Sequence, residues 1–455
     1  MKEQDLTQGS VGKNLLRFGL PYLLSAFLQT FYGLADVFIT GQFNGAASIT
    51  AVTVGSQVTH MLTVVIVGLA MGGTVSIGLA VGAKNRPGAS RAIGNTTVLF
   101  ALFAVIATVL LLAGTSGILS LLSVPEAAWQ EARRYLLICF AGVPFITAYN
   151  VLSSIYRGLG DSRRPMYFVA VAGVINIGLD YWMIGPLAMG AAGAALATVI
   201  AQGLSVVLAL WYLKRHMEGL ALGRRDFRVD RPVMGQILRV GLPVAVQDGF
   251  VQVAFLTITV IANRRGVEVA AAVGIVEKFI SFLFLVPSAM LSAVSAIAAQ
   301  NAGAGEHRRG RTTLYYAMAV CVAVGLAVAV VCQFRAETVL RLFAREEPNV
   351  IALGAEYLRS YVFDCAVAGI HFCFSGYFCA YQRSIWSFVH NLAAILLVRI
   401  PGAWLASVYF PATLYPMGWA APLGSALSAL ICVAVFLVIK RRGGWDTAPT
   451  VSDGA

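Results

Sequence analysis

The sequence predicts an all-α integral membrane protein with twelve transmembrane helices, arranged as two pseudo-symmetric six-helix bundles around a central cavity. Three observations lead to this prediction. The composition is too apolar for a soluble fold, twelve apolar stretches are long enough to span a bilayer, and an internal repeat divides the chain into two halves.

The composition comes first. Of 455 residues, 58% are hydrophobic and only 12% are charged, whereas a soluble domain carries about 25% charged residues. A soluble fold of this length could not hide so much apolar surface, because surface area does not shrink fast enough with size. The 45 glycines agree with a membrane protein, since small residues let spanning helices approach closely. The N-terminus is polar and the first apolar run leads into a full-length span, so we expect no cleavable signal peptide.

The spans follow from length and apolarity. A spanning helix needs roughly 20 mostly apolar residues. Twelve stretches satisfy this requirement, at residues 14–39, 46–79, 92–114, 130–156, 165–184, 190–213, 233–262, 268–298, 313–334, 354–381, 384–408 and 419–439.

The basic residues predict the orientation, because cytoplasmic loops carry an excess of Lys and Arg. A cytoplasmic N-terminus places most of the 33 Lys and Arg residues on the cytoplasmic side. We therefore expect a multi-pass protein of a prokaryotic plasma membrane with both termini in the cytoplasm. The net charge of +12 is then a topology signal, and we expect no nucleic-acid partner.

The chain also repeats itself. Residues 15–21 (LLRFGLP) recur 222 residues later as residues 237–243 (ILRVGLP), and Tyr135 and Tyr357 keep the same offset. Six spans per half make the repeats parallel, and transporters commonly bind substrate between such halves. The predicted organisation is an N-terminal lobe at 1–218, a cytoplasmic linker at 219–232, a C-terminal lobe at 233–442 and a cytoplasmic tail at 443–455.

Polar side chains in the first half converge on one level of the membrane. An ionisable residue inside a span costs a few kcal/mol, so each is a functional candidate. Asp36 comes late in the first span, and Tyr135 opens the fourth. With a rise of 1.5 Å per residue, Asn176 lies about 16 Å and Asp180 about 22 Å from the cytoplasmic face, and Thr198 lies about 12 Å from the outer face. Five polar side chains from four spans thus reach the outer half together.

Such a set suits a small cation. The oxygens of Asp36, Asn176, Asp180 and Thr198 could bind Na⁺, which prefers oxygen ligands. They equally suit a proton, because burial and a second carboxylate nearby both favour the protonated form of a carboxyl group. The alternative is that the two aspartates cap helix ends or face interfacial water.

The second half carries a different set of charges at membrane depth, namely Asp248, Lys278, Asp364 and Arg399. Asp364 and Arg399 fall in adjacent spans, so we expect an ion pair between them. The pair could be purely structural, or it could contact an anionic substrate or act as a gate. A basic residue in the cavity would weaken the assumption of a cationic cargo.

Pro21 lies early in the first span, where it removes one helix hydrogen bond and can kink the helix. A bend there would move Asp36 relative to the fifth span, so Pro21 is a candidate hinge. The alternative is a fixed packing geometry.

Histidines and cysteines carry no predicted chemistry. His60, His371 and His390 are isolated, and we expect them to be satisfied or pore-lining histidines, since no second ligand lies at metal-binding spacing. The seven cysteines lie in apolar segments without a C-x-x-C pair, which indicates small buried hydrophobic residues.

Several motifs in this order resemble the MATE family of multidrug and toxic compound extrusion transporters, over residues 12–440. Within the family the pattern is similar to the DinF-like branch, in the MOP flippase superfamily. The motifs are Gly19-Leu20-Pro21 with Asp36 fifteen residues later, residues 51–57 (AVTVGSQ), 157–165 (RGLGDSRRP), Asn176 to Asp180, and 190–198 (GAAGAALAT).

The resemblance implies a secondary active transporter that exports amphipathic, cationic drugs or metabolites in exchange for H⁺ or Na⁺ by alternating access. It implies no cofactor other than the coupling ion, and no enzymatic activity. It places the coupling cation at residues matching Asp36, Asn176, Asp180 and Thr198. Tyr32 and Tyr135 match hydroxyls of the same network, and Asn150 is a weaker match.

The chain departs from the family's other prokaryotic branch, which carries an acidic residue where this chain has Ala368. The expected partners are a small-molecule substrate and the lipid bilayer. Since one chain contains both halves, a monomer is expected. A lipid-linked oligosaccharide flippase of the same superfamily is the alternative. A membrane-embedded transferase would need clustered carboxylate metal ligands at a membrane face, and the sequence has no such motif.

Overall fold

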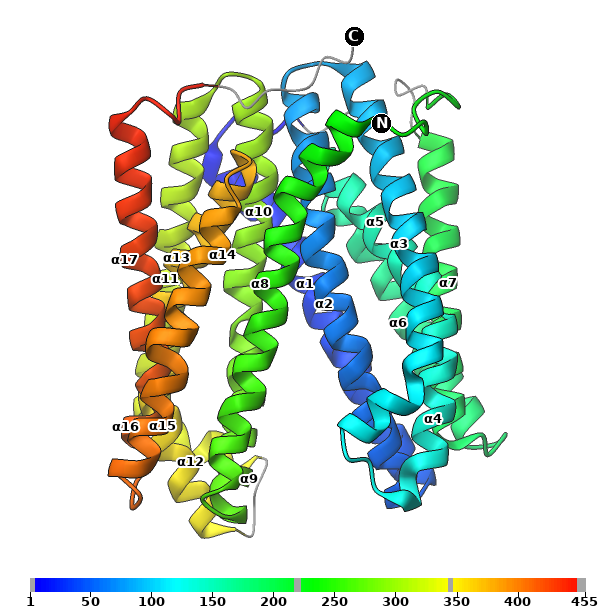
Figure 1. Ribbon diagram of the computed structural model, residues 1–455, viewed down its shortest axis with the longest axis vertical. Coiled ribbons are helices and arrows are strands. Elements are labelled where there is room, and N and C mark those ends of the chain that lie inside the picture. The colour runs from blue at the N-terminus through cyan, green and yellow to red at the C-terminus, as the bar shows by residue number, and fades with distance from the viewer. Residues whose placement is uncertain (1–4, 217–221, 343–346, 448–455) are drawn as a thin grey trace. The chain divides into compact units, whose positions relative to one another are not determined.

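The computed structural model describes residues 5–216, 222–342 and 347–447, and in these ranges it consists of helices and turns without a β-strand (Figure 1). Ten of the described helices are long and apolar enough to cross a membrane, or twelve if each of two bent pairs is one span. The all-α membrane prediction is thus confirmed. Residues 219–221 of the predicted linker and 448–455 of the predicted tail lie outside the described residues.

The described chain divides into two compact units. The first contains residues 20–241, and the second contains residues 6–19 and 242–447. Helix α1 (Val11–Phe43) therefore changes unit directly before Pro21, and helix α8 (Arg231–Asn263) changes unit directly before Pro243. The lobe boundaries predicted at 218 and 232 remain predictions.

The first unit is built around α2 (Ala46–Gly82), which contacts α3, α4, α5 and α7. Residues 68–80 of α2 are buried on every side, because this stretch is rich in glycine, alanine and serine and lets its neighbours approach closely. The other helices of this unit are α3 (Arg86–Leu121), α4 (Glu126–Ala141), α5 (Val143–Gly158), α6 (Arg163–Ile184) and α7 (Gly190–His216).

The second unit is built around α10 (Leu285–Gly303), which contacts α9, α11 and α13 and is fully buried over residues 292–302. Its other elements are α9 (Val267–Leu283), α11 (His307–Arg341), α12 (Pro348–Tyr361), α13 (Asp364–Ala380), α14 (Ile385–Ala394), the π-helical turn η1 (Ile395–Arg399), α15 (Ile400–Tyr409), α16 (Tyr415–Gly418) and α17 (Ala420–Arg441).

Prolines explain several breaks in the spans. α4 and α5 form one span bent by 47°, because Pro144 has no N–H for the carbonyl of Phe140. Pro287 likewise leaves the carbonyl of Leu283 without its partner, where α9 ends. Pro401 follows the π-helical turn η1. The 42° bend between α12 and α13 has no proline, and it starts α13 at Asp364.

The repeat in the sequence corresponds to a repeat in the structure. Both α1 and α8 expose an apolar stripe, and equivalent members of the two stripes are again 222 residues apart. The matching exposed residues are Leu20, Leu24, Phe31, Leu34 and Phe38 on α1, and Leu242, Val246, Val253, Leu256 and Val260 on α8.

A glycine controls the crossing of α2 and α8 inside the first unit. A methyl group on Gly241 would overlap the backbone oxygen of Leu69, and such overpacking typically costs about 1–3 kcal/mol. We therefore expect Gly241→Ala to lower the melting temperature of the purified protein. Gly235→Ala is the control on the same helix, because no atom of the described part of the chain lies within 4 Å of its new methyl group. Equal melting temperatures for the two variants would contradict this account.

Candidate cation site

Asp36 lies on α1 with only 3% of its surface exposed. Its carboxylate oxygen Oδ2 accepts a hydrogen bond of 3.2 Å from the Thr198 hydroxyl on α7. The hydroxyl of Thr40, one turn further along α1, donates to the backbone oxygen of Asp36 at 2.7 Å. The predicted contact between the first span and the helix that carries Thr198 is therefore present.

Asn176 and Asp180 lie one turn apart on α6, with 1% and 0% of their surfaces exposed. Both side chains lie beside the Asp36 carboxyl group, close enough to interact with it directly. Among the described residues, however, both Asp180 oxygens, Asp36 Oδ1 and the Asn176 amide atoms have no hydrogen-bond partner of normal geometry. Two buried carboxyl groups thus lie together, and three of their four oxygens have no hydrogen-bond partner among the described residues.

Tyr135 of α4 reaches the same cluster, and it interacts electrostatically with Asp36 and Asp180. It is 2% exposed. Its ring fits against Gly55 of α2, where a methyl group would overlap the ring. The absence of a side chain at Gly55 is thus what allows Tyr135 to enter the cluster.

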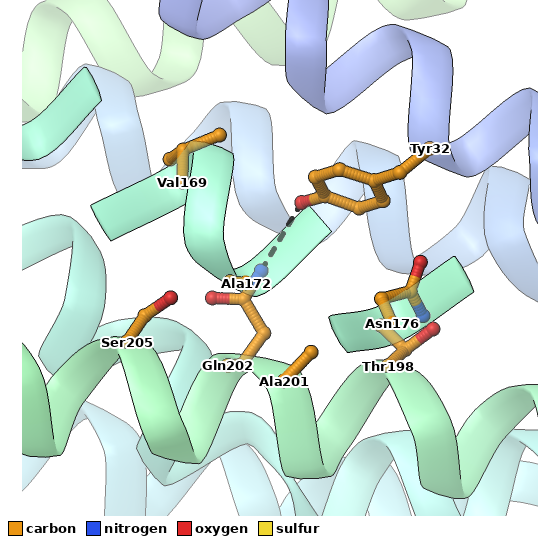
Figure 2. Close-up of a pocket in the computed structure, with 8 residues that line it drawn as sticks. All are labelled: Tyr32, Val169, Ala172, Asn176, Thr198, Ala201, Gln202 and Ser205. Carbon is orange, nitrogen blue, oxygen red and sulfur yellow. Dashed lines mark hydrogen bonds between the residues drawn. The ribbon is translucent and has the colours of Figure 1, made fainter. Parts of the chain in front are cut away.

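A small cavity, shown in Figure 2, is lined in part by Asn176 and Thr198, which also lie beside the Asp36 carboxyl group. Its volume of about 10 Å³ is about the room that one water molecule needs. The lining residues come from α1, α6 and α7, and they are Tyr32, Val169, Ala172, Asn176, Thr198, Ala201, Gln202 and Ser205.

Tyr32 is one of the predicted residues of the cation site, whereas Gln202 is not. The amide nitrogen of Gln202 donates to the Tyr32 hydroxyl at 3.3 Å. The Tyr32 ring packs against Gly173 of α6, whose missing side chain leaves room for it. Gln202 follows Thr198 by four residues and so shares its face of α7, a periodicity that could have indicated it.

Asn150 belongs to the same unit but bonds elsewhere. Its amide donates to the Ile146 carbonyl of its own helix at 2.8 Å. Within the described residues no hydrogen bond joins it to either aspartate. Its predicted role stays untested.

The second unit contains the expected ion pair. Arg399 donates to Asp364 at 2.8 Å, and the Asp364 side chain is fully buried. The same guanidinium lies 3.4 Å from the Tyr361 hydroxyl and stands over the Phe255 ring at 5.6 Å. Asp364 is the first residue of α13, where the helix dipole favours a negative charge.

The other two charges of the second half remain apart from this pair. Lys278 is exposed, and Asp248 accepts a 3.4 Å hydrogen bond from the neighbouring Gln247 side chain. Neither forms an ion pair within the described part of the chain. Glu277 approaches Thr259 at 3.5 Å and interacts electrostatically with Arg399.

The prediction that His371 and His390 are isolated is wrong. Their rings lie 5.4 Å apart. The expectation of a satisfied histidine is confirmed for His390, which bonds to Ser375 and Ser428 at 3.0 Å each. The contact was missed because the two residues lie on different helices. Across the described ranges, no three His, Cys, Asp or Glu side chains gather as metal ligands. All seven cysteines are free and buried, as expected.

Repeated bundles of spanning helices with buried charged side chains define a polytopic membrane transporter. The chain belongs to the MatE family, whose model matches residues 21–182 and again 243–405. The two matches begin 222 residues apart, which is the offset of the predicted repeat. This is a family of multidrug efflux transporters.

Three relatives illustrate the range of the family. The chain is 29% identical to the probable multidrug resistance protein YpnP of Bacillus subtilis over 452 residues, 98% of both chains. It is 26% identical to the FAD transporter of Shewanella oneidensis over 422 residues, 88% of this chain and 89% of that one. It is 26% identical to the DNA damage-inducible protein F of Escherichia coli over 308 residues, 65% and 64% of the chains, which supports the DinF-like branch.

Solved structures share the fold. An outward-facing multidrug resistance MATE family transporter of the MOP superfamily superposes with a TM-score of 0.90 at 22% identity, covering 97% of this chain and 99% of that one. A MOP superfamily transporter from Pyrococcus furiosus, described as having a binding pocket of reverse polarity, gives 0.89 at 22% identity, covering 97% and 98%.

The hydrogen bond between Thr198 and Asp36 can be tested by removing the hydroxyl while keeping the shape of the side chain. Thr198→Val leaves the carboxylate with one donor fewer, and hydrogen bonds to charged groups are worth about 1.5–3 kcal/mol. We expect a lower melting temperature, with Thr198→Ser close to the parent. Thr97→Val is the control, because among the described residues that hydroxyl bonds only to the Ile93 carbonyl of its own helix. An equal loss in Thr97→Val would argue against a special role of Thr198.

The Asp364–Arg399 pair can be separated into structure and function. Arg399→Met leaves a buried carboxylate without its partner, which costs about 3–5 kcal/mol. The double variant Asp364→Leu/Arg399→Met should recover most of that loss in thermal unfolding. A folded double variant that still exports indicates a structural pair, whereas one that folds but does not export indicates a contact used in transport. A double variant less stable than Arg399→Met would refute the pairing.

Proposed function

We propose that the protein is an ion-coupled exporter that moves amphipathic, cationic compounds out of the cell while H⁺ or Na⁺ enters through the first unit. The observation that carries this proposal is the meeting of Asp36 and Asp180 in a buried, oxygen-rich place. A carboxylate in a low-dielectric interior has to be neutralised, and a mobile proton or cation can do this.

Neutralisation provides a mechanism for coupling. Without a bound ion, the carboxylates of Asp36 and Asp180 repel each other. A bound proton or cation removes this repulsion, so ion binding changes the interaction between α1 and α6. A transporter that binds its ion better in one conformation is shifted toward that conformation. The membrane potential supplies about 2.3 kcal/mol per charge and 100 mV.

Each side chain has an assigned part. Asp36 and Asp180 carry the negative charge, and Asn176 and Thr198 supply neutral oxygens beside them. Tyr135 and Tyr32 flank the site. Pro21 lies where α1 passes from the second unit into the first, and a bend there would move Asp36 relative to α6.

The cargo and setting follow from the family and the sequence. Relatives named multidrug resistance or export proteins support a small amphipathic compound as cargo. They do not favour a lipid-linked oligosaccharide flippase. The basic loops support a plasma-membrane protein with both termini in the cytoplasm. Both repeats lie in one chain, which supports a monomer.

Removal of one carboxylate charge tests the site. We expect Asp36→Asn to abolish cation-driven dye efflux from everted membrane vesicles, while the amount of folded protein stays at the parent level. Asp446→Asn is the control, because that residue forms an exposed ion pair with Arg311. Normal transport by Asp36→Asn would remove the support for the proposal.

The coupling ion is tested with imposed gradients in proteoliposomes. A sodium gradient at equal pH on both sides drives export if Na⁺ is the coupling ion, and a pH gradient without sodium drives it if H⁺ is. The effective gradient should fail in Asp180→Asn. Export that ignores both gradients would show that the transporter is not coupled to either ion.

A further inference from the structure

The cavity beside the carboxyl groups has two polar lining residues, Gln202 and Ser205, that the proposed function does not use. Tyr32 of α1 lines one side, and Gln202 and Ser205 of α7 line the other (Figure 2). Ser205 is 1% exposed, and its hydroxyl approaches the Phe168 carbonyl at 3.4 Å. The cavity therefore continues the polar cluster along α7.

Gln202 is held in an orientation that leaves one polar atom unused. Its amide nitrogen donates to the Tyr32 hydroxyl, so the oxygen Oε1 faces away from Tyr32, toward the side of Ser205 (Figure 2). Oε1 is buried and has no hydrogen-bond partner among the described residues. An unpartnered buried oxygen is unfavourable, and in proteins it commonly marks a water or ion position.

The wall suits a small cation. Amide and hydroxyl oxygens are the ligands that hard monovalent cations prefer. Asn176 and Thr198 belong to both places, because they line the cavity and also lie beside Asp36. The cavity itself contributes only neutral oxygens, so a cation would be held there less tightly than between two carboxylates.

The cavity extends from Thr198 toward the predicted cytoplasmic end of the unit. Thr198 and Ser205 are seven residues apart, about 10 Å along the helix axis. Ser205 lies nearer the end of the unit where α5 turns into α6, which the basic loops predict to be cytoplasmic. Tyr149 continues the polar line toward that end, with Ser153 and Ser25 beside it.

The positive charge of Arg157 lies at the cytoplasmic end of this row of polar side chains and blocks it in the present conformation. Arg157, in the last turn of α5, is 7% exposed, and its guanidinium lies 5.3 Å from the centre of the Tyr22 ring. It also interacts with Tyr149. A cation would be repelled there, so it would wait in the cavity until the helices move.

We propose that the cavity is a second position for the coupling cation, one step inward from Asp36 and Asp180, and that Gln202 holds the cation there before it leaves. This inference rests on the proposed function. If the ion is Na⁺, Gln202 Oε1 coordinates it directly. If it is a proton, the carboxylic acid transfers it to a water molecule bound at Oε1, leaving a carboxylate and a hydronium ion.

The first test separates release from loading. Gln202→Met keeps the length of the side chain and removes Oε1. We expect the maximal rate of gradient-driven efflux to fall about tenfold, while the external ion concentration for half-maximal rate changes less than about twofold. Sodium and pH gradients are applied separately, so the arm that drives the parent identifies the ion. Gln333→Met, which breaks a side-chain bond to the Arg359 carbonyl, is the control for losing a glutamine.

A comparison of Gln202→Met with Asp36→Asn distinguishes failure of the second position from failure of the proposed function. If Asp36→Asn is inactive while Gln202→Met exports at the parent rate, the second position is refuted and the carboxylate site stands. If Asp36→Asn exports normally, the proposed function itself fails. If Gln202→Met does not fold, Ser205→Ala must show the same slowed release, and its normal rate would refute the inference.

The second test does not depend on transport. While a driving gradient is applied, Ser205→Cys should react with a small cationic thiol reagent added from the cytoplasmic side, because movement of the helices then opens the path that Arg157 closes. Val206→Cys is the matched control, since Val206 is adjacent and buried but does not line the cavity. The parent is the blank, because its seven cysteines are buried. Equal reaction of the two variants, or none at Ser205→Cys in the presence of a driving gradient, would overturn the proposal.

Discussion

Two carboxyl groups that meet away from water dominate the first unit. A buried charge without a partner is strongly unfavourable, and two like charges side by side make the cost greater. Asp36 and Asp180 are brought together by α1 and α6, and nothing in the described structure gives Asp180 a cationic partner. The surrounding residues follow from this constraint. Thr198 supplies a donor, and Gly55 and Gly173 admit the rings of Tyr135 and Tyr32.

In the second unit a buried carboxylate is neutralised in a different way. Its buried Asp364 has a permanent counter-charge in Arg399, with Tyr361 as a further neighbour. The 42° break before α13 places the carboxylate at a helix N-terminus, and the π-helical turn before Pro401 ends at the arginine. A pair neutralised by the protein itself needs no mobile ion. The two repeats therefore share a fold but differ in their electrostatics.

The long helices α1 and α8 connect the repeat to the site. Each starts in one unit and continues in the other, and each changes unit beside a proline at the same place in the repeat. Because α1 carries Asp36 and Tyr32, the state of the carboxyl groups and the geometry of this helix are linked. The exposed apolar stripes of α1 and α8 match residue by residue at the 222-residue offset.

The sequence alone was sufficient for the all-helical class, the spans, the 222-residue repeat, and the candidates Asp36, Asn176, Asp180 and Thr198, because apolar length and helical periodicity are local properties. The sequence could not show that Gln202 turns an unpartnered oxygen toward a cavity, or that the rings of His371 and His390 lie together. It also could not show that the span formed by α12 and α13 bends without a proline. Those features depend on how helices distant in sequence pack, and packing decides which side chains face each other.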